Sequence, residues 1–185
     1  LLHKEYHEQE YNRQGGPFQM VQLWDNPPAQ AKMTEPKYQA LTNAEMGRVK
    51  LPGGCEVEII AGEFAGVKGP ATTFSPVHLY NLKLKKGETL ELDYPAGYTT
   101  AILAVEGSAT FNGAETLPTD HLALFARDGE HITVNAIDDS VLLVMSGEPL
   151  NEPIAQYGPF LMNTQEEIAQ AIHDYQSGKF GYLAD

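Results

Sequence analysis

The sequence predicts an all-β fold, a barrel of antiparallel strands followed by one C-terminal helix. Short apolar runs recur about every ten residues, with Gly, Pro, Asn or Asp between them, as in sandwiches and barrels. Only one stretch, close to the C-terminus, has a clear helical periodicity. The even strand spacing favours a closed or nearly closed barrel, because closure removes exposed strand edges.

After an opening strand that holds His3 and Glu5, FQMVQLW (residues 18–24) is predicted to form a strand, and an irregular connector follows it at residues 26–38. Three prolines in that connector remove backbone donors and restrict φ. The strands expected after it are EVEIIAGE (56–63), VHLYNLKL (77–84), GETLELDYP (87–95), GYTTAILAVEGSATFNG (97–113), DHLALFA (120–126), EHITVNA (130–136) and SVLLVMSGE (140–148).

Residues 164–177 are predicted to form the closing helix. Asn163 is a good N-cap residue, and Glu166 stands three positions later, as in a capping box. Gly178 is suited to end the helix. One apolar face is expected, made of Ile168, Ile172 and Tyr175. A single apolar face indicates that the helix lies against another element, and we expect the outside of the barrel.

The composition excludes several functional classes. The net charge is −13 with only 12 Lys and Arg, which argues against direct nucleic-acid binding. No apolar run approaches the roughly 20 residues of a membrane span, and no signal-peptide pattern opens the sequence. A single cysteine, Cys55, fits a reducing compartment. We therefore expect no membrane partner and a cytoplasmic location, or a nuclear one in a eukaryote.

His3 and Glu5 are the candidate metal ligands. In a strand, residues two apart point to the same face, so both side chains could reach one ion. Imidazole with carboxylate suits Fe(II), Mn, Ni, Cu or Zn. A solvated terminal strand remains the alternative interpretation. His7 continues the alternation as a distorted third ligand, although its polar surroundings favour a solvated loop.

The other histidines have simpler interpretations. His78 alternates with apolar residues, which predicts a core histidine satisfied by a hydrogen bond. His121, His131 and His173 are expected at the surface. No transition metal is expected at Asp93, Thr100, His78 or His131.

Three stretches resemble the pirin family, two-domain bicupins of the cupin superfamily. The first two are LLHKE (1–5) and FQMVQLWDNPPAQAKMTEPKYQAL (18–41). The third is SGEPLNEPIAQYGPFLMNTQEEIAQAIHDYQSGKFG (146–181), which resembles the C-terminal signature of the family. The resemblance covers essentially the whole chain.

The resemblance implies a metal site and a domain organisation. Pirins hold one Fe in the N-terminal cupin through three His and one Glu, and His3 and Glu5 match the last His-x-Glu pair. The two earlier ligands have no counterpart here, so the chain is expected to be the truncated C-terminal part of a larger protein. Residues 1–45 would then be the remnant of the N-terminal cupin, and residues 46–185 a C-terminal cupin without metal.

The resemblance also implies two classes of function. One is a quercetin 2,3-dioxygenase-type enzyme that opens a flavonol ring with O₂, with Glu5 as the base. The other is an iron-dependent, redox-sensing regulatory protein that acts through protein–protein contacts. The expected partners are the missing N-terminal cupin half or a partner protein, and a flavonol. The 185-residue chain alone is expected to bind Fe(II) weakly or not at all and to be inactive.

Overall fold

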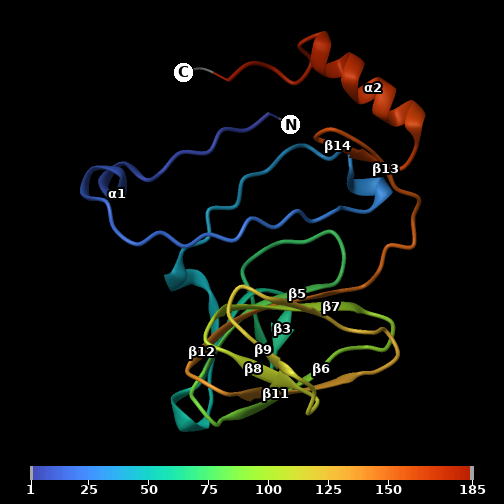
Figure 1. Ribbon diagram of the computed structural model, residues 1–185. Helices are drawn as coiled ribbons and strands as arrows, with labels where there is room; N and C mark the ends of the chain where they lie inside the picture. Colours follow the sequence, from blue (N-terminus) through green and yellow to red (C-terminus); the bar gives the residue numbers. More distant parts are fainter. Residues whose placement is uncertain (1, 184–185) are drawn as a thin grey trace. The chain divides into compact units, whose positions relative to one another are not determined.

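The computed structural model describes residues 2–183. The chain forms two compact units (Figure 1). One runs from Tyr38 to Leu150, and the other combines the residues up to Lys37 with those from Asn151 onward. The sequence predicts a different kind of boundary, between the remnant of an N-terminal cupin (residues 1–45) and a C-terminal cupin (residues 46–185). That boundary stays a prediction.

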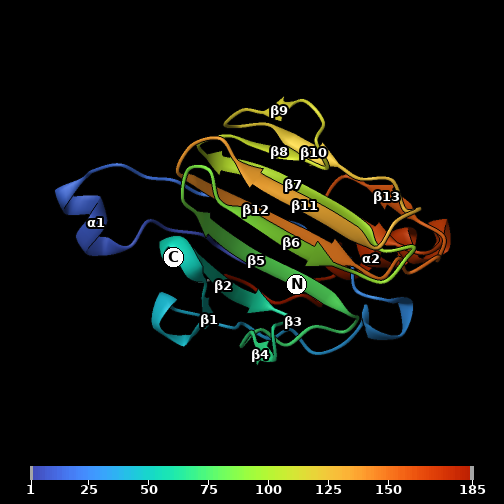
Figure 2. The ribbon, with the colours of Figure 1, turned by 90° about the horizontal axis from the view of Figure 1, so that it is seen from below.

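Two antiparallel sheets make up the unit that begins at Tyr38 (Figure 2). The order across the six-stranded sheet is β1 (Gly47–Lys50), β2 (Glu56–Ala61), β5 (Val77–Leu84), β12 (Ser140–Gly147), β7 (Thr99–Glu106) and β10 (Leu122–Leu124). The order across the four-stranded sheet is β6 (Thr89–Asp93), β11 (His131–Ala136), β8 (Ala109–Phe111) and β9 (Thr116–Leu117). Three short elements complete the unit: η2 (Asn43–Glu45), η3 (Pro52–Gly54) and the hairpin of β3 (Glu63–Phe64) with β4 (Val67–Lys68).

The two sheets stay open, which corrects the expectation of a closed or nearly closed barrel. The large sheet ends at β1 and β10, and the small one at β6 and β9. Three of these four edge strands have two to four residues. Short edges offer few unpaired backbone groups, so closure is not needed to protect them. The all-β fold with a C-terminal helix is confirmed.

The core lies between the sheets because both contribute to one buried cluster. In β5, Tyr80, Leu82 and Leu84 are buried at alternate positions, as the period of a strand requires. The large sheet adds Val57, Ile59, Ile102, Ala104, Leu142 and Val144, and the small sheet adds Leu92, Ala109, Phe111, Ile132, Val134 and Ala136. The pattern that predicted these strands therefore also predicted their buried face.

The other unit contains little sheet. Its elements are α1 (Gln9–Gln14), η1 (Ala29–Ala31), the hairpin of β13 (Ala155–Tyr157) with β14 (Phe160–Met162), and α2 (Gln165–Gln176). Helix α2 contacts both strands of that hairpin. Ile168 is buried, Ile172 is partly buried and Tyr175 is exposed, so only part of the expected apolar face is covered.

The sequence predicted a capping box at the start of α2 and a glycine at its end, but it placed the N-cap one residue too early. Thr164, and not Asn163, is the N-cap residue, and its hydroxyl accepts a hydrogen bond from the Glu167 N–H at 3.2 Å. The Glu167 carboxylate accepts in turn from the Thr164 N–H at 2.9 Å, which completes the capping box. Gly178 ends the helix as predicted, with a φ of 75° that favours glycine.

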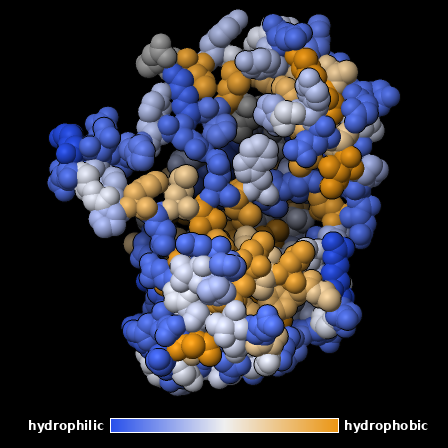
Figure 3. All heavy atoms as spheres, in the orientation of Figure 1, coloured by the Kyte–Doolittle hydropathy of each residue, from blue (hydrophilic) through white to orange (hydrophobic). Residues whose placement is uncertain are grey.

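The N-terminal segment differs from its prediction. Residues 2–8 and 18–24 form no strand, whereas α1 occupies a stretch expected to be a loop, with the Glu8 carboxylate capping it. A strand needs a neighbour for its backbone groups, and residues 18–24 have no paired strand within residues 2–183. Their large apolar side chains are exposed, among them Phe18, Met20 and Trp24. Figure 3 shows apolar atoms at the surface beside α1.

Candidate functional site

His3 and Glu5 lie next to each other, although no strand carries them. The Nδ1 atom of His3 is 3.7 Å from the Oε1 atom of Glu5. Both side chains are well exposed, at 66% and 62%. Gln22 donates from Nε2 to the same Glu5 oxygen at 3.5 Å, which ties the opening stretch to residues 18–24. One nitrogen and one oxygen donor are thus brought together and remain accessible.

His7 faces a different neighbour. Its ring meets the Phe18 ring edge to face, with the centroids 5.1 Å apart. This contact directs the imidazole of His7 toward an apolar surface. Within residues 2–183 no group of three or more His, Cys, Asp or Glu side chains could hold a metal ion. Among residues 2–183, His3 and Glu5 therefore offer two potential metal ligands without a third.

His78 has the hydrogen bond that the sequence predicts, but it is partly buried and not part of the core. Its Nδ1 atom shares a hydrogen bond of 2.5 Å with the Tyr80 hydroxyl, and that hydroxyl donates to the backbone carbonyl of Glu63. Burial lowers the pKa of the His78 imidazole, which favours the neutral ring. His78 is thereby held by a neighbouring side chain of its own strand, β5.

His131 is exposed, as predicted, but it belongs to a polar cluster that the sequence did not reveal. Its Nδ1 atom lies 2.7 Å from Asp93 Oδ1, and its Nε2 atom lies 2.7 Å from Glu91 Oε2. The Thr133 hydroxyl donates to the same Glu91 oxygen. The hydrogen bond to Asp93 raises the pKa of the His131 imidazole, with help from Glu91. This cluster depends on the register between β6 and β11, which pairs His131 with Asp93 and Thr133 with Glu91.

Thr100 also has a partner of its own. Its hydroxyl shares a buried hydrogen bond of 2.7 Å with the Ser146 hydroxyl on the neighbouring strand. Asp93, His78 and Thr100 therefore each bind another residue of the same unit.

The fold agrees with the comparison to known proteins. The sequence profile of the pirin C-terminal cupin domain matches residues 79–181, more than half of the chain. The chain belongs to the pirin family. This assignment confirms the resemblance seen in the sequence, and it accounts for the two-sheet unit as part of a cupin domain.

Individual relatives of this pirin-family chain support the assignment. A Pseudomonas aeruginosa protein named "Putative quercetin 2,3-dioxygenase" is 44% identical over 97% of this chain and 63% of its own length. Pirin-1 of Arabidopsis thaliana is 35% identical over 98% of this chain and 63% of its own length. The chain thus spans less than two thirds of the length of these curated relatives.

A solved structure shows the same fold. The crystal structure of a quercetin 2,3-dioxygenase from Acinetobacter baumannii matches with a TM-score of 0.82 and 42% identity. The match covers 87% of this chain and 56% of that one.

None of the helices within residues 2–183 is both long and apolar enough to cross a membrane.

Proposed function

We propose that His3 and Glu5 are two ligands of a single transition-metal site, with Fe(II) as the metal, and that this site serves a quercetin 2,3-dioxygenase-type reaction. The observation that carries the proposal is the exposed nitrogen–oxygen pair, 3.7 Å apart. Imidazole with carboxylate is a donor set that suits Fe(II). The relatives named as quercetin 2,3-dioxygenases support the choice of reaction.

The remaining ligands are proposed to come from residues that this chain does not contain. No third donor joins His3 and Glu5 within residues 2–183. The curated relatives continue well beyond the matched region. Two ligands on an exposed segment are not preorganised, and binding would have to offset the ordering of that segment. The 185-residue chain alone is therefore expected to bind Fe(II) weakly.

The chain's own residues would have two tasks. When bound, the metal would supply Lewis-acid and redox chemistry toward the flavonol and O₂. Glu5 is proposed as the base that takes the proton of the flavonol hydroxyl. Gln22 would orient the Glu5 carboxylate through its hydrogen bond to Glu5 Oε1. Opening the flavonol ring would then proceed with the hydroxyl deprotonated.

A chimaera tests the metal site. On the proposal that the missing ligands precede this chain, the unmatched part of the Pseudomonas relative is joined to the start of the chain, and the iron content is measured after loading with Fe(II). We expect about one iron per chimaera and little iron on the 185-residue chain. His3→Ala or Glu5→Ala should remove most of the iron, because a lost ligand typically weakens binding strongly. His7→Ala is the matched control and should retain it.

The activity is tested on the same proteins. Loss of quercetin absorbance with matching O₂ uptake should occur in the loaded chimaera and fall sharply in Glu5→Ala. A loaded chimaera without any turnover would count against the reaction while leaving the metal site intact. Equal iron content in His3→Ala and the parent chimaera would instead eliminate the metal site.

A second candidate function is an iron-dependent, redox-sensing regulator that acts through a partner protein. The exposed apolar side chains of residues 18–24, Phe18, Met20 and Trp24 among them, favour it, because exposed apolar surface is typical of interaction sites. Trp24 is the single tryptophan, so its fluorescence reports on this surface. If the Trp24 emission maximum in the chimaera stays at the wavelength of a solvent-exposed tryptophan, the surface is accessible to a partner protein. A blue shift would assign the surface to contacts within the longer chain.

A further inference from the structure

The opening stretch lies beside the stretch that begins at Phe18, and the two run in opposite directions. Gln22 donates from Nε2 to Glu5 Oε1 at 3.5 Å. Two positions after Glu5, the His7 ring meets the Phe18 ring, with the centroids 5.1 Å apart. Both stretches leave α1 in the same direction (Figure 1). Because both contacts join side chains, Glu5, His7, Phe18 and Gln22 lie on one side of the two stretches.

Phe18 presents an aromatic surface on that side. Its ring is contacted by His7 and also by Tyr11, whose ring centroid lies 5.9 Å away. These two contacts support the Phe18 ring, and the residue still remains 58% exposed. Met20 stands between Phe18 and Gln22 and is also exposed. In an extended chain, residues two apart point to the same side, so an apolar surface leads away from the candidate metal ligands.

The spacing of these residues sets the size of molecule that can use the surface. His7 is two positions from Glu5, which corresponds to about 7 Å of strand rise, and the Phe18 ring lies beyond the His7 ring. A single aromatic ring held at Glu5 through its hydroxyl is too short to reach Phe18. An outer ring of a three-ring flavonol reaches it.

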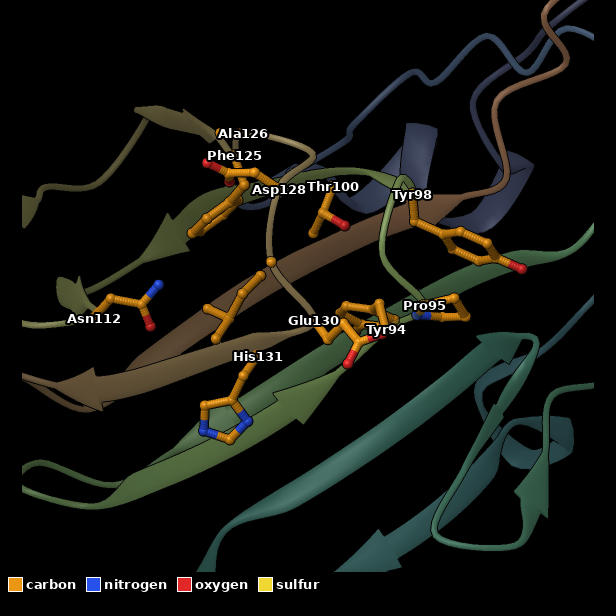
Figure 4. A pocket seen from close by; sticks show the side chains of 12 residues that line it. Tyr94, Pro95, Tyr98, Thr100, Asn112, Phe125, Ala126, Asp128, Glu130 and His131 are labelled. Atoms are coloured by element: carbon orange, nitrogen blue, oxygen red, sulfur yellow. The ribbon is translucent and has the colours of Figure 1, made fainter.

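The cavity of the two-sheet unit fits such a molecule less well. Its volume is about 170 Å³, and an engineered cavity of about 150 Å³ in another protein accommodates one benzene molecule. Figure 4 shows its lining, with Tyr98 on one side and Phe125 on the other. The histidine of this lining, His131, has a carboxylate oxygen 2.7 Å from each ring nitrogen, so it offers no free ligand atom. The opening stretch is therefore the better place for a metal and a three-ring substrate.

We infer that Phe18 is a specificity-determining residue of the proposed quercetin 2,3-dioxygenase-type site. The Phe18 ring packs against an outer ring of the flavonol, while the flavonol hydroxyl reaches Glu5 and Met20 covers the rings between them. This inference rests on the proposed function, because it takes Glu5 as the base. Contact between aromatic rings favours binding, so the site selects multi-ring substrates over single-ring phenols.

An anaerobic titration of the Fe(II)-loaded chimaera with quercetin tests the role of Phe18, because binding is then measured without turnover. Phe18→Ala should weaken quercetin binding about three- to tenfold, the effect of one aromatic contact, and should leave the iron content unchanged. Phe18→Tyr keeps an aromatic ring and should bind quercetin as the parent chimaera does. Val21→Ala is the matched control, because Val21 is exposed and points to the other side of an extended chain.

Catechol distinguishes contact with the substrate from a structural role of Phe18. It presents a single ring with hydroxyl groups, so it can reach Glu5 and the metal but not Phe18. We expect Phe18→Ala to bind catechol as tightly as the parent chimaera. A damaged site would weaken the binding of catechol and quercetin together, and that result would overturn the inference.

The remaining outcomes separate the inference from the proposed function. If Phe18→Ala and the parent chimaera bind quercetin equally, the inference is wrong and the proposed function stands. If the parent chimaera does not bind quercetin, both are wrong. Binding that depends on Phe18, without turnover in air, supports the inference and counts against the reaction. A chimaera without iron counts against the metal site, and the same quercetin titration still decides the role of Phe18.

Discussion

Two stretches of this chain have similar strand patterns and different structures. Residues 77–84 form β5, paired with β2 on one side and β12 on the other, and Tyr80, Leu82 and Leu84 are buried. Residues 18–24 are as apolar, but they form no strand, and Phe18, Met20, Leu23 and Trp24 are exposed. Alternating apolar residues therefore predict the tendency to form a strand, and a paired neighbour decides whether it forms.

The largest expected difference between the two stretches concerns core packing. Leu82 is fully buried between Val57 and Leu142 of the neighbouring strands. Leu82→Ala should lower the free energy of unfolding by about 2–5 kcal/mol, because it leaves a cavity. Leu23→Ala, on the exposed stretch, should change it by less than about 0.5 kcal/mol. Urea unfolding of both variants checks this, and similar losses would mean that residues 18–24 are packed in solution.

The next comparison concerns two glutamates in the two units. Glu58 is 2% exposed, and its carboxylate lies 2.7 Å from the Lys83 Nζ atom and 3.1 Å from the Arg48 guanidinium. Burial raises the pKa of the Glu58 carboxyl, but these partners outweigh burial, so the pKa lies below its usual value. Glu58→Gln should lower the free energy of unfolding by about 1–3 kcal/mol at pH 7. Glu5→Gln, at an exposed position, should leave it nearly unchanged.

The effect of Glu58→Gln should depend on pH. A lowered pKa in the folded state stabilises the protein above the unfolded value of 4.5, and this contribution disappears as the pH falls through the folded pKa. The difference between the parent chain and Glu58→Gln should therefore shrink between pH 5 and pH 3, as measured by urea unfolding. A difference that grows in acid would contradict the lowered pKa.

A smaller effect on the free energy of unfolding is expected at the N-cap of α2. This helix belongs to the unit that also contains residues 18–24. Thr164→Ala should cost about 1 kcal/mol, because the Glu167 N–H loses its acceptor. The control Glu166→Ala replaces an exposed residue of the first turn and should cost less. Helix content by circular dichroism and thermal unfolding provide the measurement. Equal effects of the two substitutions would show that the helix does not depend on its cap.

The smallest expected effect is on the pKa of a histidine. Both ring nitrogens of His131 lie 2.7 Å from a carboxylate oxygen, whereas His3 Nδ1 lies 3.7 Å from Glu5 Oε1. The His131 pKa should lie above the usual 6.5, and Asp93→Asn should lower it, because the hydrogen bond to Asp93 is the main cause. A raised pKa stabilises the fold below pH 6.5 and ceases to do so as the pH rises through the folded pKa. Ring-proton NMR titrations test this, with Asp128→Asn as control. An unchanged titration in Asp93→Asn would exclude the cluster.

The sequence by itself predicted the parts of the fold that depend on local pattern. Strands β2, β5, β7, β11 and β12 follow the alternation of apolar residues. Helix α2 follows its periodicity and its terminal Gly178, although the capping box begins at Thr164 and not at Asn163. The family was also recognisable from sequence, since long stretches of matching residues need no tertiary information.

Only the tertiary structure decided which residues meet. It left the two sheets open and residues 18–24 without a strand. It placed His131 beside Asp93 and Glu91, and it buried the Tyr94 hydroxyl without a hydrogen-bond partner among residues 2–183. Propensity and periodicity describe a residue and its near neighbours along the chain. Hydrogen-bond partners and cavities depend on register between distant strands, which no local pattern specifies.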